Sequence, residues 1–271
     1  MENITTFDYY KYEHRELGWN TPADYMDYVH PHWRQFEAPN PYLHYMLGVF
    51  YTGFMFASLI GNGVVIWVFA SAKSLQTPSN LFVINLAILD FIMMVKTPVF
   101  IINSFNEGPI WGKLGCDIFA LLGSYAGIGG AATNAAIAFD RYRTIARPFD
   151  GKLNRTQALG LCVLCWLYAT PFSLMPFFNI WGRFVPVFIF SLFTFLLIYR
   201  ALITPFVSML PALTCKAVAC IDPWIYAINH PRYRLELQKR MPWFCIHEPE
   251  PPKTDSSSVS SEKTVATNET S

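Results

Sequence analysis

The stretch PALTCKAVACIDPWIYAINHPRYR, from Pro211 to Arg234, decides how the rest of this sequence is interpreted. It places one lysine, Lys216, in a run that has no other basic side chain between Arg200 and His230. If the run crosses a lipid bilayer, an ammonium at its middle costs about 2.5 to 3.5 kcal/mol and lies too far from either end to reach water fully. A residue that carries such a cost is expected to have a function.

The composition indicates a membrane protein with several spans. Of the 271 residues, 53% are hydrophobic, 17% aromatic and only 14% charged, whereas a typical soluble domain has about 25% charged residues. A helix needs about 20 predominantly apolar residues to cross a bilayer. Such stretches lie at 43–70, 81–102, 117–139, 157–181 and 203–229, and a shorter one lies at 184–199. The sequence therefore predicts an all-α fold, a multi-pass bundle of five to six transmembrane helices.

The distribution of basic residues sets the orientation of this bundle. They gather in three segments, at Lys73, at Arg141, Arg143, Arg147, Lys152 and Arg155, and at Arg232, Arg234, Lys239 and Arg240. By the positive-inside rule all three segments face the cytosol. Residues 1–40 then form an extracellular N-terminal tail in which Asn3 is a glycosylation candidate, although an unused sequon is equally compatible. Residues 246–271 are too polar to fold alone and are expected to form a disordered cytoplasmic tail.

The same rule restricts the segment 184–199. A full additional span there would place the cluster at 230–234 outside the cell, against the charge distribution. The stretch is also short, with some 16 residues between Arg183 and Arg200. We expect a surface-lying, re-entrant or strongly tilted helix, or an extra span in a mis-oriented product.

Several polar residues lie within the apolar stretches and are expected to turn inward. Asn62, Asn85, Asp90 and Asp222 would be costly against lipid, so they should pair with one another inside the bundle. For Asn62, Asn85 and Asp222, holding neighbouring helices together is the simpler explanation. Prolines within the apolar stretches suggest kinked helices, whose freed backbone carbonyls need partners. These prolines are at positions 98, 171, 176, 211 and 223.

That simple explanation fails for Lys216, because a lysine at the middle of a membrane helix costs about 2.5 to 3.5 kcal/mol on insertion and is functional by default. Burial favours the neutral amine of a lysine, whose lone pair can attack an aldehyde and form a Schiff base. A buried, nucleophilic lysine in a helical bundle therefore indicates a covalent carbonyl cofactor.

Short motifs recur in a fixed order along the chain. They are GN at 61–62, NLAILD at 85–90, WGKLGCD at 111–117, DRY at 140–142, the tryptophan at 166, the lysine at 216 with DPWIY at 222–226, and HPRYR at 230–234. As a set they resemble the arthropod visual opsins, which are class A G protein-coupled receptors, over about 40–183 and 203–245. DRY or a DPxxY-like motif alone would be a weak signal. A lysine six residues before that motif is the specific mark of opsins.

The resemblance implies roles for individual residues. Lys216 would bind 11-cis-retinal, or 3-hydroxyretinal, as a Schiff base. Arg141 of DRY would hold the inactive state and contact the G protein, and Asp140 and Tyr142 would be further signalling residues. Asp140 and Arg141 could form a local ion pair that acts as a two-state element. Asp222, Pro223 and Tyr226 would act in signalling, with Tyr226 swinging inward on activation. Asn62, Asp90 and Asp222 would form a polar network that couples the retinal pocket to the cytosolic end of the bundle.

The resemblance also implies partners and a location. The partners would be retinal, a heterotrimeric Gq-like G protein and arrestin, in a membrane and without nucleic acid. The place would be the rhabdomeric plasma membrane of photoreceptor cells.

A second lysine within the membrane, Lys96, narrows the resemblance to ultraviolet-sensitive insect opsins. If Lys96 points toward the Schiff base, its charge disfavours protonation there, and an unprotonated Schiff base absorbs in the ultraviolet. The alternative is a lysine that reaches outward from its helix to water. Phe119, where relatives carry a carboxylate or tyrosine near the retinylidene nitrogen, is apolar and offers no counterion.

The chain departs from the resemblance between Trp181 and Leu202. An opsin would carry the second outer loop, helix five, the third inner loop and helix six there, so the rhodopsin-like bundle at 41–230 is expected to be incomplete, with 184–200 as an atypical replacement. The loop partner of Cys116 is missing, so we expect this cysteine to be unpaired. Helix eight, within 231–245, remains, and Cys245 after it is a palmitoylation candidate.

The departure leaves alternatives open. A shortened chain can be a non-signalling isoform, or a gene-model product, that binds or retains the full-length receptor, and retention in the endoplasmic reticulum is compatible with the truncation. A transporter or channel would show paired repeats, which the sequence lacks. An enzyme is the least favoured class, because no nucleophile and base constellation and no metal-spaced His/Cys cluster stands out in the membrane-embedded part.

Overall fold

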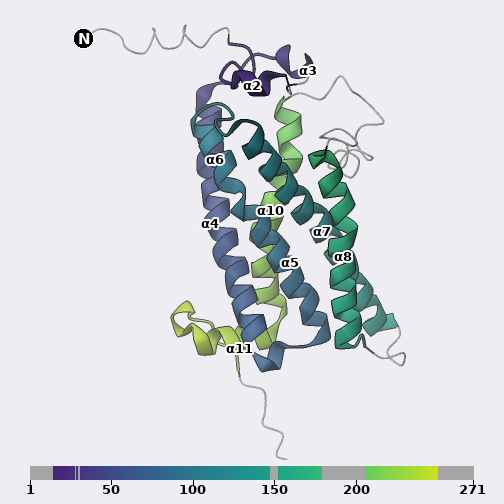
Figure 1. Ribbon diagram of the computed structural model, residues 1–271. Coiled ribbons are helices and arrows are strands. Elements are labelled where there is room, and N and C mark those ends of the chain that lie inside the picture. Colours follow the sequence, from purple (N-terminus) through teal and green to yellow (C-terminus); the bar gives the residue numbers. More distant parts are fainter. Residues whose placement is uncertain (1–14, 28, 30, 147–151, 179–204, 250–271) are drawn as a thin grey trace, which may run out of the picture.

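The computed structural model describes residues 15–27, 29, 31–146, 152–178 and 205–249. Figure 1 shows them as a bundle of long helices that run between two ends, with the short helices α2 and α3 at one end and α11 at the other. The glycosylation candidate Asn3, the basic residue Arg147, the segment 184–199 and the tail from 250 onward lie outside the described residues.

Five long helical stretches form the described part of the bundle, and α5 and α6 together make up one of them. The helices are α4 (Pro41–Ser71), α5 (Pro78–Val95), α6 (Thr97–Phe105), α7 (Gly112–Ala146), α8 (Arg155–Phe177) and α10 (Pro205–Asn229). The 3-10 helix η1 (Lys73–Leu75) joins α4 to α5, and α11 (Pro231–Arg240) and η3 (Pro242–Phe244) follow α10. The all-α fold predicted from the sequence is confirmed.

Four of these stretches are long and apolar enough to cross a membrane: Pro41–Ser71, Pro78–Phe105, Gly112–Ala146 and Arg155–Met175. The stretch predicted as one helix at 81–102 consists of two, because α5 ends at Val95 and α6 begins at Thr97. Pro98 at the start of α6 has no N–H to continue the ladder. By contrast, α8 and α10 continue past Pro171 and Pro223.

A polar cap followed by proline starts three of the helices. The side chain of Asn40 accepts a hydrogen bond from the Tyr42 N–H before α4, and that of Thr77 accepts from Asn80 N–H before α5. His230 caps α11 in the same way. In each case proline occupies the first helical position, where its missing N–H costs nothing and its fixed φ suits the helix.

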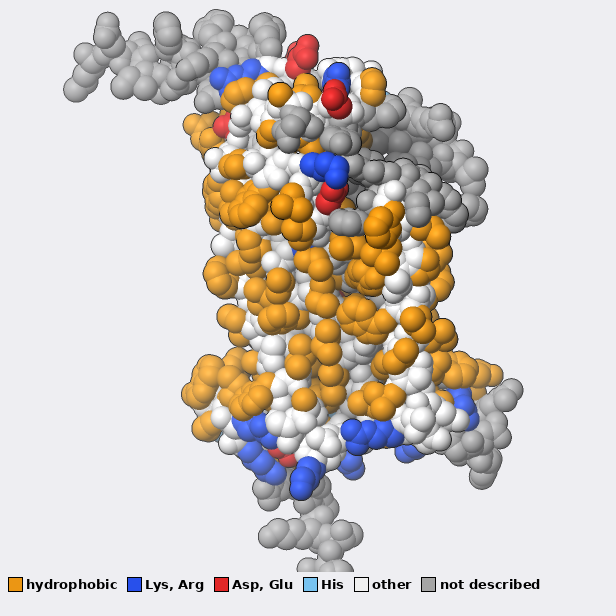
Figure 2. All heavy atoms as spheres, viewed as in Figure 1, with side chains coloured by type: hydrophobic (Ala, Val, Ile, Leu, Met, Phe, Trp, Pro, Cys, Tyr) orange, Lys and Arg blue, Asp and Glu red, His pale blue; other side chains and the backbone are white. Residues whose placement is uncertain are grey.

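The arrangement of charge agrees with a membrane orientation. Figure 2 shows Lys and Arg side chains gathered at the end of the bundle that carries α11, and hydrophobic side chains covering the part between the two ends. Exposed apolar residues in that part include Phe56, Ile60 and Leu164. Apolar side chains that would be unfavourable in water are suited to lipid.

The largest buried cluster among the described residues lies at the α11 end. It joins α4, η1, α5 and α11 through nine residues: Val65, Val68, Phe69, Ala72, Leu75, Val83, Ala87, Tyr233 and Leu237. The rings of Phe69 and Tyr233 stack with centroids 5.1 Å apart. Further along, α4 and α10 approach closely because Gly61 has no side chain; a Cβ there would lie 2.9 Å from Pro223 Cγ.

Part of the N-terminal segment folds over the opposite end of the bundle. Residues Ala23–Met26 and Pro31–Arg34 form α2 and α3, and an isolated bridge pairs Glu16 with Glu37. Asn20 Nδ2 donates to the Asn106 carbonyl at 2.7 Å, which ties the segment to the turn after α6. A segment expected only as an extracellular tail therefore contains a small ordered cap.

Candidate functional site

Lys216 lies deep in the bundle, on α10, within a cage of aromatic rings. It is 4% exposed. Its Nζ lies 4.7 Å from the Tyr51 ring centroid, 5.7 Å from that of Phe119 and 5.9 Å from that of Phe100. These rings come from α4, α7 and α6, so four elements meet around the amine. Aromatic faces stabilise a nearby cation and exclude water.

Lys96 approaches the same cage from the junction of α5 and α6. It is 7% exposed, and its Nζ donates to the Phe119 carbonyl at 3.2 Å. The ammonium also lies 4.0 Å from the Phe119 ring centroid. Lys96 is thus turned into the bundle, and the alternative of a lysine reaching outward to water is wrong. The structure brings together three residues singled out from the sequence: Lys216, Lys96 and Phe119.

Tyr51 and Phe100 belong to this cage but carry no individual signal in the sequence. Their ring centroids lie 4.3 Å apart, and Phe100 lies 6.2 Å from Phe119. Phe100 follows Lys96 by four residues, a spacing that places two helical side chains on one face, so it could have been found once Lys96 was. The chain has 14 tyrosines, and nothing local distinguishes Tyr51.

A buried amine among aromatic rings suits a carbonyl ligand with a long apolar body. The rings give a dry, apolar surface, and the nitrogen of Lys216 is the group that can bond covalently to an aldehyde carbon. The chemistry of the residues present therefore fits the predicted kind of cofactor.

Two polar links lie in the middle of the bundle. Asn62 Nδ2 donates to Ser58 Oγ and to the Ala219 carbonyl, each at 3.0 Å, which joins α4 to α10. Asn85 Nδ2 donates to Thr133 Oγ1 at 2.8 Å. These bonds hold neighbouring helices together, as expected for asparagines within a membrane.

Asp90 and Asp222 face each other across α5 and α10, close enough to interact electrostatically, and the hydroxyl of Tyr226 lies within range of both. Three buried polar atoms of this region have no hydrogen-bond partner in the described part of the chain: Asn62 Oδ1, Asp90 Oδ2 and Tyr226 Oη. The expected polar residues therefore cluster, although no hydrogen bond links Asn62 to Asp90 within the part that the structure describes.

The DRY motif lies at the end of α7. Asp140 is 2% exposed, whereas the side chains of Arg141 and Tyr142 are exposed. The expected ion pair between Asp140 and Arg141 is not among the ion pairs of the described residues. Adjacent residues on an α-helix point about 100° apart, so they do not face each other.

His230 lies between the ends of α7, α10 and α11. Burial lowers the pKa of His230, and the nearby positive charges of Arg141 and Arg232 lower it further. Burial also raises the pKa of Tyr233, on the next turn, to about 12. Arg141 is thus electrostatically linked to the start of α11.

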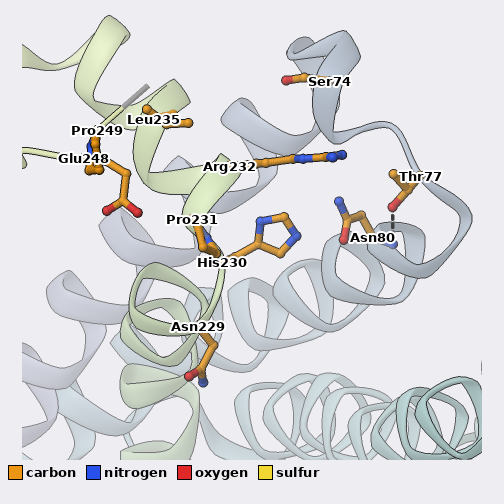
Figure 3. A pocket seen from close by; sticks show the side chains of 10 residues that line it. All are labelled: Ser74, Thr77, Asn80, Asn229, His230, Pro231, Arg232, Leu235, Glu248 and Pro249. Atoms are coloured by element: carbon orange, nitrogen blue, oxygen red, sulfur yellow. Dashed lines mark hydrogen bonds between the residues drawn. The ribbon is translucent and has the colours of Figure 1, made fainter. Parts of the chain in front are cut away.

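A pocket of about 530 Å³ opens beside His230. Figure 3 shows Arg232 and the His230 ring on one side, and Thr77 and Asn80 from the start of α5 facing them. Glu248 lines the far side, where its carboxylate accepts two hydrogen bonds from Arg234 at 2.7 and 2.9 Å. The pocket lies at the end where basic residues gather, away from the lysine cage.

Two cysteines singled out in the sequence have contrasting surroundings. Cys116, near the start of α7, is half-buried and forms no disulfide with another described cysteine. Cys245 is exposed directly after η3, beside the exposed rings of Trp243 and Phe244.

Comparisons with known proteins agree with this arrangement. Residues 61–186 match the family model of the 7 transmembrane receptor (rhodopsin family). The ultraviolet-sensitive opsin of Apis mellifera is 42% identical over 346 positions, which cover 92% of this chain and 93% of that protein. The blue-sensitive opsin of the same organism is 38% identical, covering 91% of each chain. Opsin Rh3 of Drosophila melanogaster is 36% identical, covering 93% and 91%.

The crystal structure of squid rhodopsin superimposes with a TM-score of 0.71 at 24% identity, covering 82% of this chain and 92% of that chain. This likeness confirms the rhodopsin-like bundle. The alignment to the ultraviolet-sensitive opsin spans more positions than the 271 residues present here, so that relative carries residues within the aligned region that this chain lacks. Opsins are receptors and not enzymes, and by these comparisons the chain belongs to the opsin family of rhodopsin-like membrane receptors.

Proposed function

We propose that the chain is a retinal-binding photoreceptor of the ultraviolet type that couples light absorption to a G protein. The single observation that carries this proposal is the cage of Tyr51, Phe100 and Phe119 around Lys216. Within it, Lys216 forms the Schiff base with 11-cis-retinal or 3-hydroxyretinal, which supplies the light-absorbing double-bond system. The aromatic rings exclude water from the imine and protect it from hydrolysis.

The proposed ultraviolet type rests on Lys96. Its ammonium lies on one side of the Phe119 ring, 4.0 Å from the centroid, and the Lys216 nitrogen lies 5.7 Å from the same centroid. The nitrogens of Lys96 and Lys216 are therefore no farther apart than their two distances to the Phe119 centroid added together. A positive charge at that range in a membrane interior disfavours a second positive charge. The imine is then unprotonated and absorbs in the ultraviolet.

At the cytosolic end, Arg141 and Tyr142 are exposed and available to a Gq-like G protein or arrestin. Asp222, Pro223 and Tyr226 lie between that end and the cage and would transmit the change. The location that suits this role is the rhabdomeric plasma membrane.

The test is expression with 11-cis-retinal, followed by borohydride reduction and peptide mass mapping. We expect the reduced adduct on Lys216, its loss in Lys216→Ala and its retention in Lys96→Ala. An adduct on Lys96 would contradict the assignment of the linkage. Absence of any adduct would contradict retinal binding by this chain.

A second candidate is a non-signalling form that binds or retains a full-length opsin. It is supported by the residues that the aligned relative has and this chain lacks, and by apolar side chains exposed along α10, among them Val218, Ile221 and Ile225. Co-purification with a differently tagged full-length opsin supports this candidate. Light-dependent nucleotide exchange on a G protein by the isolated chain contradicts it.

A further inference from the structure

We infer that Gly123 on α7 is the positioning residue that seats the Lys96 ammonium, and that this seat keeps the imine on Lys216 unprotonated. The inference rests on the proposed function and names a residue on which its spectral type depends.

While Lys96 keeps its position, there is no room for a side chain at position 123. A Cβ added to Gly123 would lie 2.0 Å from Lys96 Nζ and 3.3 Å from its Cε. The first distance is far inside the van der Waals contact of carbon and nitrogen, so the end of Lys96 would have to move. Gly123 thus permits the position in which Nζ donates to the Phe119 carbonyl at 3.2 Å.

Helix geometry explains why this carbonyl is open to a lysine. Within α7 the carbonyl of Phe119 points toward the N–H of the residue four positions later, which is Gly123. A side chain at that position would cover the approach to the oxygen, because residues four apart lie on one face. With hydrogen alone on the Gly123 Cα, the second lone pair of the oxygen is accessible to the ammonium of Lys96.

This acceptor matters because the ammonium is buried. A buried charge without hydrogen-bond partners is strongly unfavourable. The Phe119 carbonyl and the Phe119 ring, 4.0 Å away, both stabilise the charged form of Lys96. Moving Nζ away from this carbonyl favours the neutral amine, which no longer opposes protonation of the imine.

The neighbouring glycine provides a matched control. Gly127 lies one turn further along α7, and the nearest atom to a Cβ there is Met93 Cε at 3.9 Å, an ordinary contact. Alanine at either position raises the helix propensity of α7 by the same amount. A difference between the two variants therefore reports the contact with Lys96 and not a general effect on the helix.

The experiment compares five proteins carrying the same tag: the unchanged chain, Gly123→Ala, Gly127→Ala, Lys96→Ala and the double variant that combines Gly123→Ala with Lys96→Ala. Each is loaded with 11-cis-retinal, and its visible band is titrated with pH. We expect the unchanged chain and Gly127→Ala to absorb in the ultraviolet at neutral pH. In Gly123→Ala the visible band should form at a proton concentration at least about tenfold lower than in the unchanged chain. When Lys96 is already alanine, the Gly123→Ala substitution should shift the titration of this band no further.

A titration of Gly123→Ala that matches the unchanged chain would overturn the inference. So would an equal shift in the Lys96→Ala background, because the effect would then come from retinal itself. A second readout needs no retinal: the rate of reductive methylation of Lys96 in the ligand-free protein, measured by mass spectrometry. We expect a several-fold change in Gly123→Ala and none in Gly127→Ala. If no variant binds retinal, the proposed function fails, whereas this labelling still decides whether Gly123 seats Lys96.

Discussion

The histidine that caps α11 joins helix formation to pH. The Tyr233 N–H donates to Nδ1 of His230 at 3.3 Å, and a protonated ring could not accept that bond. Burial, assisted by Arg141 and Arg232, lowers the pKa of His230 below its ordinary value. The unfolded chain therefore takes up this proton at a higher pH than the folded chain does. The contribution of neutral His230 to the stability of the folded chain is therefore complete above the ordinary histidine pKa of about 6.5. It is lost as the pH falls below that value.

We expect His230→Asn to flatten this dependence. Asparagine is a good N-cap and does not titrate in this range, so the variant should lose less stability between about pH 7 and pH 5 than the unchanged chain. Thermal unfolding in detergent at several pH values measures this. An equal loss in both proteins would show that other groups carry the pH dependence.

The hydrogen-bonded triad of buried Asn85, buried Thr133 and half-buried Trp166 offers a second test on single residues. Trp166 Nε1 donates to Asn85 Oδ1 at 2.8 Å. Trp166→Phe removes the donor and leaves a buried oxygen with one partner fewer, so we expect a loss of about 1 kcal/mol in the free energy of unfolding. Trp224→Phe, at a side chain that is 58% exposed, is the matched control and should change this free energy less. Equal losses would indicate that ring size alone matters.

Single residues were the part of the site most accessible from sequence. Lys216 and Lys96 could be predicted because a charged side chain in an apolar stretch is costly wherever it occurs. Tyr51 could not, because an aromatic residue in a membrane helix carries no such cost. The Asp140 and Arg141 ion pair was expected from adjacency in sequence, and failed because adjacency on a helix is not proximity of side chains.

At the scale of elements, short sequence signals mark where helices begin more clearly than where they end. Asn40 with Pro41, Thr77 with Pro78 and His230 with Pro231 each place a cap before a proline. The break between α5 and α6 was expected only as a kink at Pro98 within one helix at 81–102, since hydropathy runs through it. The short helices α2 and α3 were also missed, because four-residue helices depend on tertiary contacts.

The element formed by α11 and η3 carries the next prediction. Trp243 is 70% exposed and Phe244 is 41% exposed beside the exposed Cys245, and aromatic rings prefer the membrane interface. We expect Cys245 to be acylated in cells, and Cys245→Ser to abolish incorporation of a clickable palmitate analogue. Cys162→Ser, in the buried part of α8, serves as the control that keeps incorporation. Label persisting in Cys245→Ser would place the modification elsewhere.

At the scale of the whole molecule, the basic residues predict the orientation in the membrane. Lys73 and Arg240 lie in the two segments that meet at the α11 end, and this end should face the cytosol. A glycosylation tag inserted after Arg240 should remain unmodified, whereas a tag before α4 should be glycosylated. Modification of the tag after Arg240 would show that the described spans cross the membrane in the opposite sense.

The buried cluster of nine residues at the α11 end has a consequence for the rates of amide deuterium exchange. Eight of its nine members lie in α4, η1, α5 and α11, and Ala72 lies between α4 and η1. Tyr226 of α10 packs against the same cluster. Slow exchange follows from such mutual burial, because amides open only when the cooperative unit around them does. In detergent, the half of α4 nearest α11 should take up deuterium more slowly than α8, whose main packing among the described helices is against α7 and α5. Peptide-resolved mass spectrometry measures this order, and its reversal would mean that the bundle opens from the α11 end.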